Sequence, residues 1–342
     1  MTNKLTISHH FPLQKLNTFG IDAYASHFLR IDEISQLVAL REDSGLRSLP
    51  RLIIGGGSNL VLSDQLDALV LQMNLQGKQV CCSDADYYYV RAAAGESWHG
   101  LVMWTLEQGM SGLENLSLIP GTVGAAPIQN IGAYGVELQD IFHELQAFDF
   151  ETGDILTLTK DDCRFAYRDS VFKQEFKDRM AILSVTLALP RVWQPKLAYA
   201  DVARYLDQHG IAAPLAKDVS DAIMAIRRAK LPDPDVIGNA GSFFKNPLVT
   251  SEFRDRLLQH YPALVSYPQA SGMVKLAAGW LIEQSGWKGK RLGSAGVYEK
   301  QALVLVNHGH ASGADIRSLA QAVQADVRAK FGVELEPEPV FA

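Results

Sequence analysis

The chain has 342 residues, of which 47% are hydrophobic and 20% charged, and a formal net charge of −6 at pH 7. This length exceeds what one ordinary hydrophobic core holds, so the sequence predicts two or three domains. An acidic balance without a basic run argues against nucleic acid or another polyanion as a partner. The N-terminal segment lacks the pattern of a secretory signal, and no apolar stretch approaches a membrane span. Three sparse cysteines, Cys81, Cys82 and Cys163, favour a reducing compartment, so we expect a cytoplasmic protein with no membrane partner.

The first seventy residues predict mixed helix and strand. Residues 33–41 carry apolar side chains at helical spacing, and residues 51–54 and 68–71 are apolar enough to be strands. One helix follows near the middle of the chain, capped by Ser97 and ended by Gly109. Otherwise strands dominate up to residue 190, the last of them alternating in character; the predicted ranges are 86–92, 142–150, 154–159 and 180–189.

The last third predicts mainly helices. Residues 276–284 place apolar side chains on one helix face and stop at Gly286, and residues 316–331 form a longer stripe. An apolar strand, residues 302–307, lies between them. The tail 334–341 carries two prolines and therefore predicts an edge strand at most.

Two glycine-rich segments are candidates for binding a phosphate-bearing ligand. The first runs from Gly55 through Gly56, Gly57 and Ser58 to Asn59, directly after a strand, so its backbone and side-chain donors suit an anion. It is not a P-loop and is a poor dinucleotide fingerprint, and an ordinary tight turn explains it equally well.

The second segment, residues 119–135, holds four glycines and three alanines and almost no charge. Small apolar residues let the main chain approach a flat ligand closely, although a tightly packed buried turn is the alternative. Because two such segments occur in one half of the chain, we expect a large cofactor that contains a pyrophosphate.

Residues 239–247, NAGSFFKNP, fit neither an amphipathic helix nor an alternating strand. A nucleophilic serine requires a nearby base and a setting such as Gly-x-Ser-x-Gly, which is absent around Ser242. Phe243 and Phe244 are expected to be packing residues.

The chain resembles the UDP-N-acetylenolpyruvoylglucosamine reductase (UDP-N-acetylmuramate dehydrogenase) family, in its type I branch. The motifs that carry the resemblance are NTFG at 17–20, GGGSN at 55–59, GLENL at 112–116, IPGTVGAAPIQNIGAYG at 119–135, YRDS at 167–170, KLP at 230–232, GSFFKNP at 241–247, KLAAGWLI at 275–282 and LEPE at 335–338. They cover nearly the whole chain.

The resemblance implies an α+β fold: a vanillyl-alcohol-oxidase-type FAD-binding domain of two α/β subdomains, followed by a C-terminal α/β substrate-binding domain. The implied borders are residues 1–70 with the returning tail 333–342, residues 71–228, and residues 229–332. The implied reaction is the NADPH-dependent reduction of UDP-N-acetylglucosamine enolpyruvate to UDP-N-acetylmuramate through non-covalent FAD, in peptidoglycan precursor synthesis.

The same resemblance implies roles for individual residues. Arg168 would bind the substrate carboxylate, Ser242 would donate a proton to carbon, and Glu338 would assist charge stabilisation or proton delivery. The implied cofactor-binding residues are Gly55, Gly56, Gly57, Ser58, Asn59, Pro120, Gly121, Gly124, Ala125, Ile131 and Gly132. The implied substrate-binding residues are Tyr167, Tyr199, Lys230, Asn246 and Gln301, whereas Lys275 would begin a helix with a packing role.

Partners and alternatives complete the expectations. We expect a UDP-sugar and NADPH as partners, a monomer, and no metal, because the histidines show no metal-ligand spacing. Ala125 and Ala126 depart from relatives that carry hydroxyl residues near the flavin. A flavin-dependent oxidase on the same fold is one alternative, although residues 51–64 lack the His or Cys that often attaches FAD in such enzymes. A non-catalytic sugar-nucleotide-binding protein is another. Taken alone, Arg168 fits a structural ion pair and Glu338 a solvated edge residue.

Overall fold

The computed structural model describes residues 5–269 and 271–342. Residues 1–4, which begin both the N-terminal segment without a signal pattern and the expected first subdomain, lie outside the described residues. The described chain divides into two compact units. The first unit comprises residues 5–11, 25–57 and 67–229, and the second comprises residues 12–24, 58–66 and 230–342.

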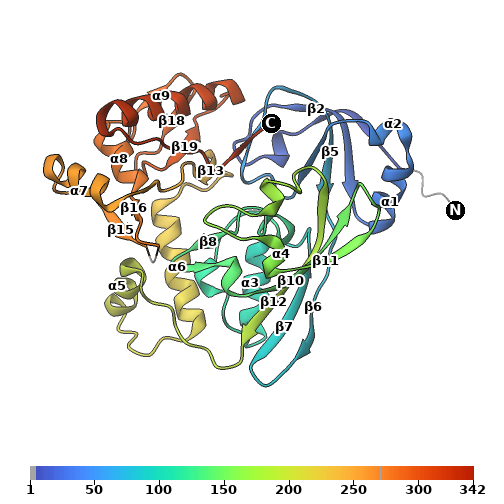
Figure 1. Ribbon diagram of the computed structural model, residues 1–342, viewed down its shortest axis with the longest axis horizontal. Helices are drawn as coiled ribbons and strands as arrows, with labels where there is room; N and C mark the ends of the chain where they lie inside the picture. The colour runs from blue at the N-terminus through green and yellow to red at the C-terminus, as the bar shows by residue number, and fades with distance from the viewer. Residues whose placement is uncertain (1–4, 270) are drawn as a thin grey trace. The chain divides into compact units, whose positions relative to one another are not determined.

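Two sheets form the frame of the first unit (Figure 1). One sheet has the strand order β1 (Ser8–Pro12), β2 (Tyr24–Ile31), β5 (Gln65–Met73) and β3 (Arg51–Ile54). The other is antiparallel, with the order β11 (Ile155–Thr159), β10 (Phe142–Asp149), β12 (Met180–Pro190), β7 (Tyr87–Ala93) and β6 (Lys78–Ser83). A short hairpin pairs β8 (Gly132–Ala133) with β9 (Val136–Glu137). The strands predicted in this part of the chain are confirmed.

The helices of the first unit begin at recognisable caps. Ser97 accepts a hydrogen bond from the N–H of Gly100 and starts α3 (Trp98–Glu107), and Gly109 follows its end with φ of 74°, as predicted. Glu33 and Gln36 form a capping box at α1 (Ile34–Glu42). The remaining helices are α2 (Ser44–Arg47), α4 (Lys160–Cys163), α5 (Ala200–Gln208) and α6 (Ala216–Lys230), with 3₁₀ turns η2 (Glu114–Leu116), η3 (Val123–Ala125), η4 (Leu138–Asp140) and η5 (Val171–Lys173).

Strand β12 corrects one expectation, because its side chains do not alternate between core and solvent. Every residue from Met180 to Leu187 is buried. Ile182 and Leu187 belong to one apolar cluster, whereas Ala181 and Leu183 belong to another. A central strand that is buried on both faces has apolar residues at successive positions in its sequence instead of an alternating pattern.

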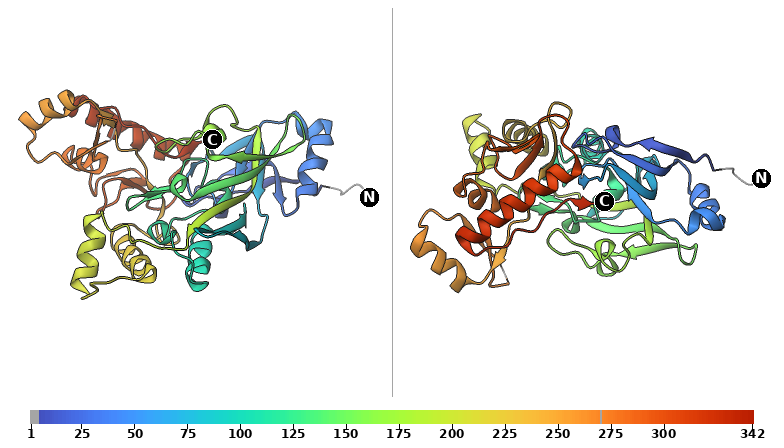
Figure 2. Two further views of the ribbon diagram at one scale, coloured as in Figure 1. Left: turned by 60° about the horizontal axis from the view of Figure 1, so that its bottom comes forward. Right: turned by 90° about the horizontal axis from the view of Figure 1, so that it is seen from above.

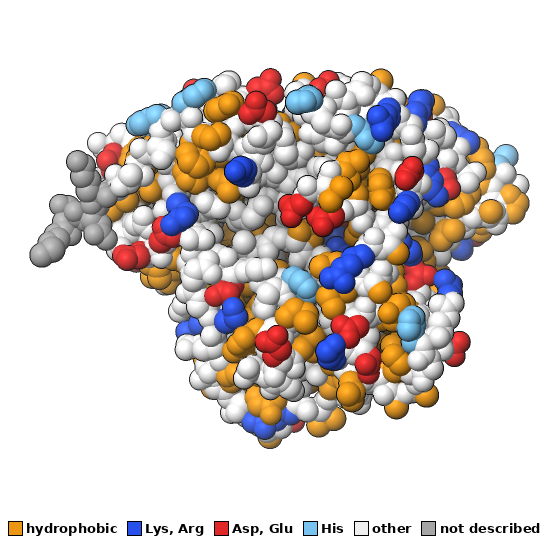
Figure 3. Space-filling view, turned by 180° about the vertical axis from the view of Figure 1, so that it is seen from behind, with side chains coloured by type: hydrophobic (Ala, Val, Ile, Leu, Met, Phe, Trp, Pro, Cys, Tyr) orange, Lys and Arg blue, Asp and Glu red, His pale blue; other side chains and the backbone are white. Residues whose placement is uncertain are grey.

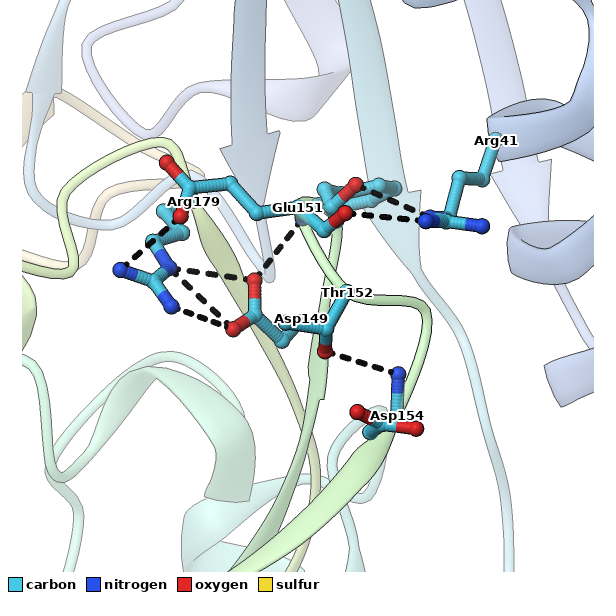
Figure 4. A network of polar contacts seen from close by, with 7 residues as sticks. Arg41, Asp149, Glu151, Thr152, Asp154 and Arg179 are labelled. Carbon is cyan, nitrogen blue, oxygen red and sulfur yellow. Dashed lines mark hydrogen bonds and ion pairs between the residues drawn. The ribbon is translucent and has the colours of Figure 1, made fainter.

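An ion pair holds the turn between β10 and β11 (Figure 4). Asp149 is fully buried and accepts hydrogen bonds from Nη2 of Arg179 at 2.6 Å and from its Nε at 3.1 Å. The hydrogen bonds from Arg179 are the main reason that the pKa of Asp149 lies below its ordinary value. Arg41 braces the same turn, donating to the carbonyl oxygens of Phe150 and Glu151.

The second unit is built from smaller sheets and three α-helices within the described chain (Figure 1). One sheet has the order β13 (Gly238–Ser242), β19 (Val304–Asn307), β18 (Ala295–Val297) and β17 (Arg291–Leu292), and another has β14 (Leu248–Val249), β16 (Val274–Leu276) and β15 (Ser266–Pro268). The C-terminal β20 (Val340–Phe341) pairs in parallel with β4 (Leu60–Val61). The helical elements are η1 (Gln14–Leu16), α7 (Ser251–His260), α8 (Ala278–Gln284) and α9 (Gly313–Phe331).

Helix α9 is the longest helix and follows its predicted pattern (Figure 2). Its predicted apolar stripe is buried, and the helix ends at Gly332, whose φ is 66°. A capping box between Ser312 and Asp315 begins it. The helix contacts β18, β19 and β4, and so helps to hold β4, which comes from the N-terminal part of the chain, in this unit.

One prediction in the second unit is wrong. Residues 275–276 belong to β16 rather than to a helix, because Lys275 pairs with Leu248 on one side and Tyr267 on the other. Helix α8 therefore begins only at Ala278. A short apolar run does not by itself distinguish the end of a strand from the start of a helix.

Residues 239–242 are a strand, although their side chains do not alternate. Asn239 pairs with Val306 and Ser242 with Val304 on β19, so one strand carries an extra residue. Gly241, with φ of 68°, lies within this irregular stretch, and the side chain of Asn239 accepts a hydrogen bond from its N–H. A bulge of this kind preserves backbone pairing while it breaks the alternation of side chains.

The surface shows mixed charge. On the face seen in Figure 3, Lys and Arg side chains are scattered among Asp and Glu. Of the helices that the structure describes, none has the length and apolar character required to cross a bilayer.

Candidate active site

The two glycine-rich segments meet within the first unit. A Cβ atom on Gly55 would lie 2.1 Å from Oγ1 of Thr122 and 3.5 Å from Cβ of Ala125. A Cβ on Gly56 would lie 3.3 Å from Cα of Gly121. The glycines therefore allow two backbone segments, far apart in sequence, to approach more closely than larger residues permit.

Packing on the other side of the second segment is equally close. A Cβ on Gly124 would lie 2.5 Å from Cβ of Ala94. Ile131 is buried, and its carbonyl oxygen accepts a hydrogen bond from the N–H of Leu138. The segment is thus held from behind by β7 and by the chain after β9, as a rigid binding loop requires.

Thr122 supplies an observation that favours a ligand at this place. Its Oγ1 is buried and makes no hydrogen bond to any residue of the described ranges. A buried hydroxyl without a partner costs free energy, so native structures usually satisfy such groups. A flavin cofactor rich in hydrogen-bonding groups fits this hydroxyl and the surrounding glycines.

A tight turn, residues 166–169, presents Arg168. The N–H of Asp169 donates to the carbonyl oxygen of Ala166 and closes the turn. Arg168 has φ of 55°, a left-handed conformation that costs a residue with a side chain about 1–2 kcal/mol. Its Nη2 donates to the carbonyl oxygen of Gly132 at 2.7 Å. Backbone strain at a candidate catalytic residue, held by its surroundings, is common at functional sites.

The same turn is tied to the glycine segment on both sides of Arg168. The side chain of Asn130 donates to the carbonyl oxygen of Ala166, and Oγ of Ser170 donates to that of Ile128 at 2.7 Å. The guanidinium of Arg168 also lies 5.4 Å from the ring centre of Tyr167. The candidate substrate-binding turn and the candidate cofactor segment are therefore joined by several hydrogen bonds within the first unit.

Tyr199 lies beside a buried cation that sequence reasoning missed. Its ring packs edge-on against Tyr134, with ring centres 5.0 Å apart, and Tyr134 forms a hydrogen bond with Arg227. Nε of Arg227 is buried without a partner in the described chain, and burial lowers the pKa of this guanidinium. The sequence shows only an Arg-Arg pair near the end of a helix, which is normally solvent-exposed. A buried guanidinium with an unused donor is suited to an anionic ligand.

Ser242 and Glu338 lie on neighbouring segments of the second unit. Ser242 is exposed at the end of β13, and Phe243 and Phe244 behind it are fully buried, as predicted. The N–H of Glu338 donates to the carbonyl oxygen of Phe243 at 2.8 Å. Glu338 is only 9% exposed, so its interpretation as a solvated edge residue is wrong. The sequence could not show this, because the burial comes from pairing with segments far away in the chain.

Three other candidate substrate-binding residues lie in the second unit. Lys230 is exposed at the end of α6. Oδ1 of Asn246 accepts a hydrogen bond from the N–H of Ala278 at 2.9 Å and so caps α8, a structural role that the sequence did not reveal. Oε1 of Gln301 accepts from the N–H of Leu303. Neither bond uses the amide NH₂ group, which is the donor suited to a phosphate.

No group of three or more His, Cys, Asp or Glu side chains within residues 5–269 and 271–342 is arranged to hold a metal ion. Cys81 and Cys82 are exposed, Cys163 is buried, and all three are free. Burial raises the pKa of the Cys163 thiol to about 12, so this thiol stays protonated.

Comparisons with known proteins first define the class of protein to which this chain belongs. A family model described as an FAD binding domain matches residues 25–159, the region that contains both glycine segments. A second model, described as the UDP-N-acetylenolpyruvoylglucosamine reductase C-terminal domain, matches residues 233–342. The fold and the converging glycines thus belong to an FAD-binding α+β flavoprotein, and the predicted fold class and cofactor are confirmed.

Full-length relatives then give the family. A UDP-N-acetylenolpyruvoylglucosamine reductase of Burkholderia vietnamiensis (strain G4 / LMG 22486) is 55% identical over 338 residues, which are 98% of this chain and 97% of that protein. One of Paraburkholderia phymatum is 56% identical over 332 residues, 96% of each chain. The chain belongs to the UDP-N-acetylenolpyruvoylglucosamine reductase family. The crystal structure of the Thermus caldophilus reductase shares the fold, with a TM-score of 0.68 and 22% identity over 99% of this chain and 98% of that one.

Proposed function

We propose that this protein reduces UDP-N-acetylglucosamine enolpyruvate to UDP-N-acetylmuramate with NADPH as the reductant. The observation that carries the proposal is the identity of more than half of the residues to reductases of this name, over nearly the whole chain. Peptidoglycan precursor synthesis is the process that uses this product. The exposed free thiols support a reducing compartment, so the proposed location is the cytoplasm. The proposed oligomeric state is a monomer.

FAD, when bound, would supply the hydride chemistry that links NADPH to the enolpyruvyl double bond. The residues that would hold it are Gly55, Gly56, Gly57, Ser58, Asn59, Pro120, Gly121, Gly124, Ala125, Ile131 and Gly132. The buried hydroxyl of Thr122 joins this set, because it belongs to the second glycine segment, lies against Gly55 of the first, and has no partner among the described residues.

Arg168 binds the carboxylate of the enolpyruvyl group in this proposal. Adding hydride to the double bond builds negative charge on the neighbouring carbon and its carboxylate, and a fixed guanidinium stabilises that charge. The left-handed backbone and the bond to Gly132 hold Arg168 in advance, so little reorganisation is needed during reaction. Tyr167, Tyr199, Lys230, Asn246 and Gln301 bind the rest of the sugar nucleotide.

Ser242 donates the proton that completes the reduction, and Glu338 assists charge stabilisation or proton delivery. Both residues are on adjoining backbone segments, since the N–H of Glu338 bonds to the residue after Ser242. A positioned general acid contributes about 10²–10⁴-fold in rate.

The proposed three-part division assigns residues 1–70 and 71–228 to FAD, residues 229–332 to the substrate, and the tail 333–342 to the site.

An anaerobic spectral titration tests the proposal. NADPH should bleach the flavin absorbance, and UDP-N-acetylglucosamine enolpyruvate should then restore it and yield UDP-N-acetylmuramate. If the substrate leaves the flavin reduced while oxygen restores it rapidly, the protein is an oxidase and the proposal fails. Ser242→Ala should keep bleaching intact and slow restoration, whereas the control Ser285→Ala should change neither. Size-exclusion chromatography with light scattering checks the monomer.

A further inference from the structure

Asn59, the last residue of the GGGSN motif, makes its clearest contacts with the C-terminal tail. Its side-chain Nδ2 donates to the carbonyl oxygen of Glu338 at 3.2 Å. Its own carbonyl oxygen accepts from the N–H of Val340 at 3.0 Å. Both partners lie in the same unit as Asn59, and the sequence separation between Asn59 and Glu338 is 279 residues.

These two bonds tie Asn59 to the backbone of Glu338 and of Val340, two residues further on. On the Ser242 side, the N–H of Glu338 donates to the carbonyl oxygen of Phe243 at 2.8 Å. The backbone N–H of Glu338 therefore bonds to the residue that follows β13, and its carbonyl oxygen bonds to Asn59. The next strand, β20, then pairs with β4. The backbone of the candidate catalytic carboxylate is clamped between two segments.

We infer that Asn59 is a positioning residue that fixes the backbone of Glu338 and thereby holds the Glu338 carboxylate for the reaction. The inference rests on the proposed function, because it deepens the role given there to Glu338. Asn59 does not need to touch the reacting atoms for this role. It acts through the peptide groups of residues 338–340, whose position decides where the carboxylate lies.

The chemistry of the side chain explains why asparagine suits this position. The bond to the carbonyl oxygen of Glu338 needs a donor, which an amide supplies and a carboxylate does not. Asn59→Asp would therefore place a carboxylate, which only accepts hydrogen bonds, against this carbonyl oxygen. An alanine removes the donor and leaves the carbonyl oxygen of Glu338 without this partner. A displacement of about 1 Å at a positioned group can lower the rate by about 10²-fold.

Half-reactions measured separately by anaerobic stopped flow test the inference. FAD is kept at saturating concentration, because Asn59 is also among the residues proposed to bind it. Under that condition, Asn59→Ala should slow reoxidation by the enolpyruvyl substrate about 10- to 100-fold more than it slows reduction of the flavin by NADPH. Hydrogen exchange of residues 336–342 should speed up, which is a readout that does not depend on turnover. If both half-reactions slow to the same extent, Asn59 serves only the cofactor and the inference is overturned.

Gln324 provides a matched control on the same tail. Its side-chain amide donates to the carbonyl oxygen of Leu335 at 2.7 Å, three residues before Glu338. Gln324→Ala removes a comparable bond and should leave reoxidation at the wild-type rate. Equal slowing in Gln324→Ala and Asn59→Ala would mean that general loosening of the tail is responsible, and would overturn the specific role of Asn59.

A double-mutant cycle with Glu338→Gln separates this inference from the proposed function. If Asn59 acts through Glu338, reoxidation in Asn59→Ala/Glu338→Gln should equal that in Glu338→Gln alone within about threefold. If the reductions in reoxidation rate of the two single variants multiply in the double variant, the inference is refuted. Wild-type reoxidation in Glu338→Gln would remove the proposed role of Glu338 itself. Slow reoxidation in Glu338→Gln with a normal rate in Asn59→Ala would refute only the role of Asn59.

Discussion

Gly55→Ala should weaken FAD binding because the two glycine segments leave no room for a side chain. The added Cβ would lie 2.1 Å from Oγ1 of Thr122 and 3.3 Å from its Cβ. Rotating the Thr122 side chain removes the first contact but not the second, so the backbone must also shift. Overpacking of this kind costs about 1–3 kcal/mol.

That cost divides between folding and binding. To the extent that the two segments move apart in the variant without FAD, the cost appears only when the cofactor brings them together. If the whole cost falls on binding, the Kd for FAD rises about 5- to 150-fold. Any remainder appears as a lower free energy of unfolding in urea. Titration of the apoprotein with FAD, followed by flavin fluorescence, and urea unfolding of the same protein measure the two parts.

The double variant Gly55→Ala/Thr122→Ala provides the sharper test. Removing Oγ1 of Thr122 takes away the shortest contact, so FAD affinity should recover toward that of Thr122→Ala alone. Gly45→Ala is the control, since the nearest atom to its added Cβ is a side-chain oxygen of Asp43 at an ordinary 3.4 Å. Wild-type FAD affinity and stability in Gly55→Ala, or no recovery in the double variant, would show that the proposed contact does not limit binding.

Three further predictions follow from individual contacts. Arg168→Gly should be about 0.5–1 kcal/mol more stable in urea unfolding than Arg168→Ala, because glycine adopts the left-handed backbone conformation without strain. Both variants should lose substrate reduction. Equal stability of the two variants would contradict the proposed backbone strain. Asp149 has a pKa below its ordinary value of 3.8 in the folded protein, so its contribution to stability is present above that pH and is lost as the pH falls through the folded-state pKa. Asp149→Asn should therefore unfold at lower temperature at pH 7, and the difference from wild type should shrink in acid; a constant difference in calorimetry would exclude the pair with Arg179 as the cause. Asn246→Asp should keep the cap at Ala278 and the thermal stability but raise the KM for the sugar nucleotide, whereas Asn246→Ala should lose about 0.5–2 kcal/mol of stability as well; an unchanged KM in both would exclude Asn246 from substrate binding.

Several local features could be predicted from sequence because short-range physics determines them. Ser97 and Gly109 bracket α3 through a cap and a left-handed residue, and the stripe of α9 follows helical spacing. The errors came where distant pairing decides the outcome. Lys275 and Leu276 lie in a strand only because β14 and β15 flank them, and residues 239–242 pair through a bulge that has no side-chain pattern.

The candidate site shows the same division. The order of the motifs identified the family and its candidate site residues, because the motifs are specific when taken together. The capping role of Asn246 and the buried Arg227 beside Tyr134 were missed, since neither follows from spacing along the chain.

By itself, the sequence of this protein determined several of its helices and strands, its two glycine segments and the family to which it belongs. Only the tertiary structure decided which of those segments touch. Thr122 meets Gly55, and Asn59 holds Glu338, across separations that local propensity cannot register. The physical reason is that capping and periodicity act over a few residues, whereas close backbone approach and burial of a polar group depend on what the rest of the chain brings alongside.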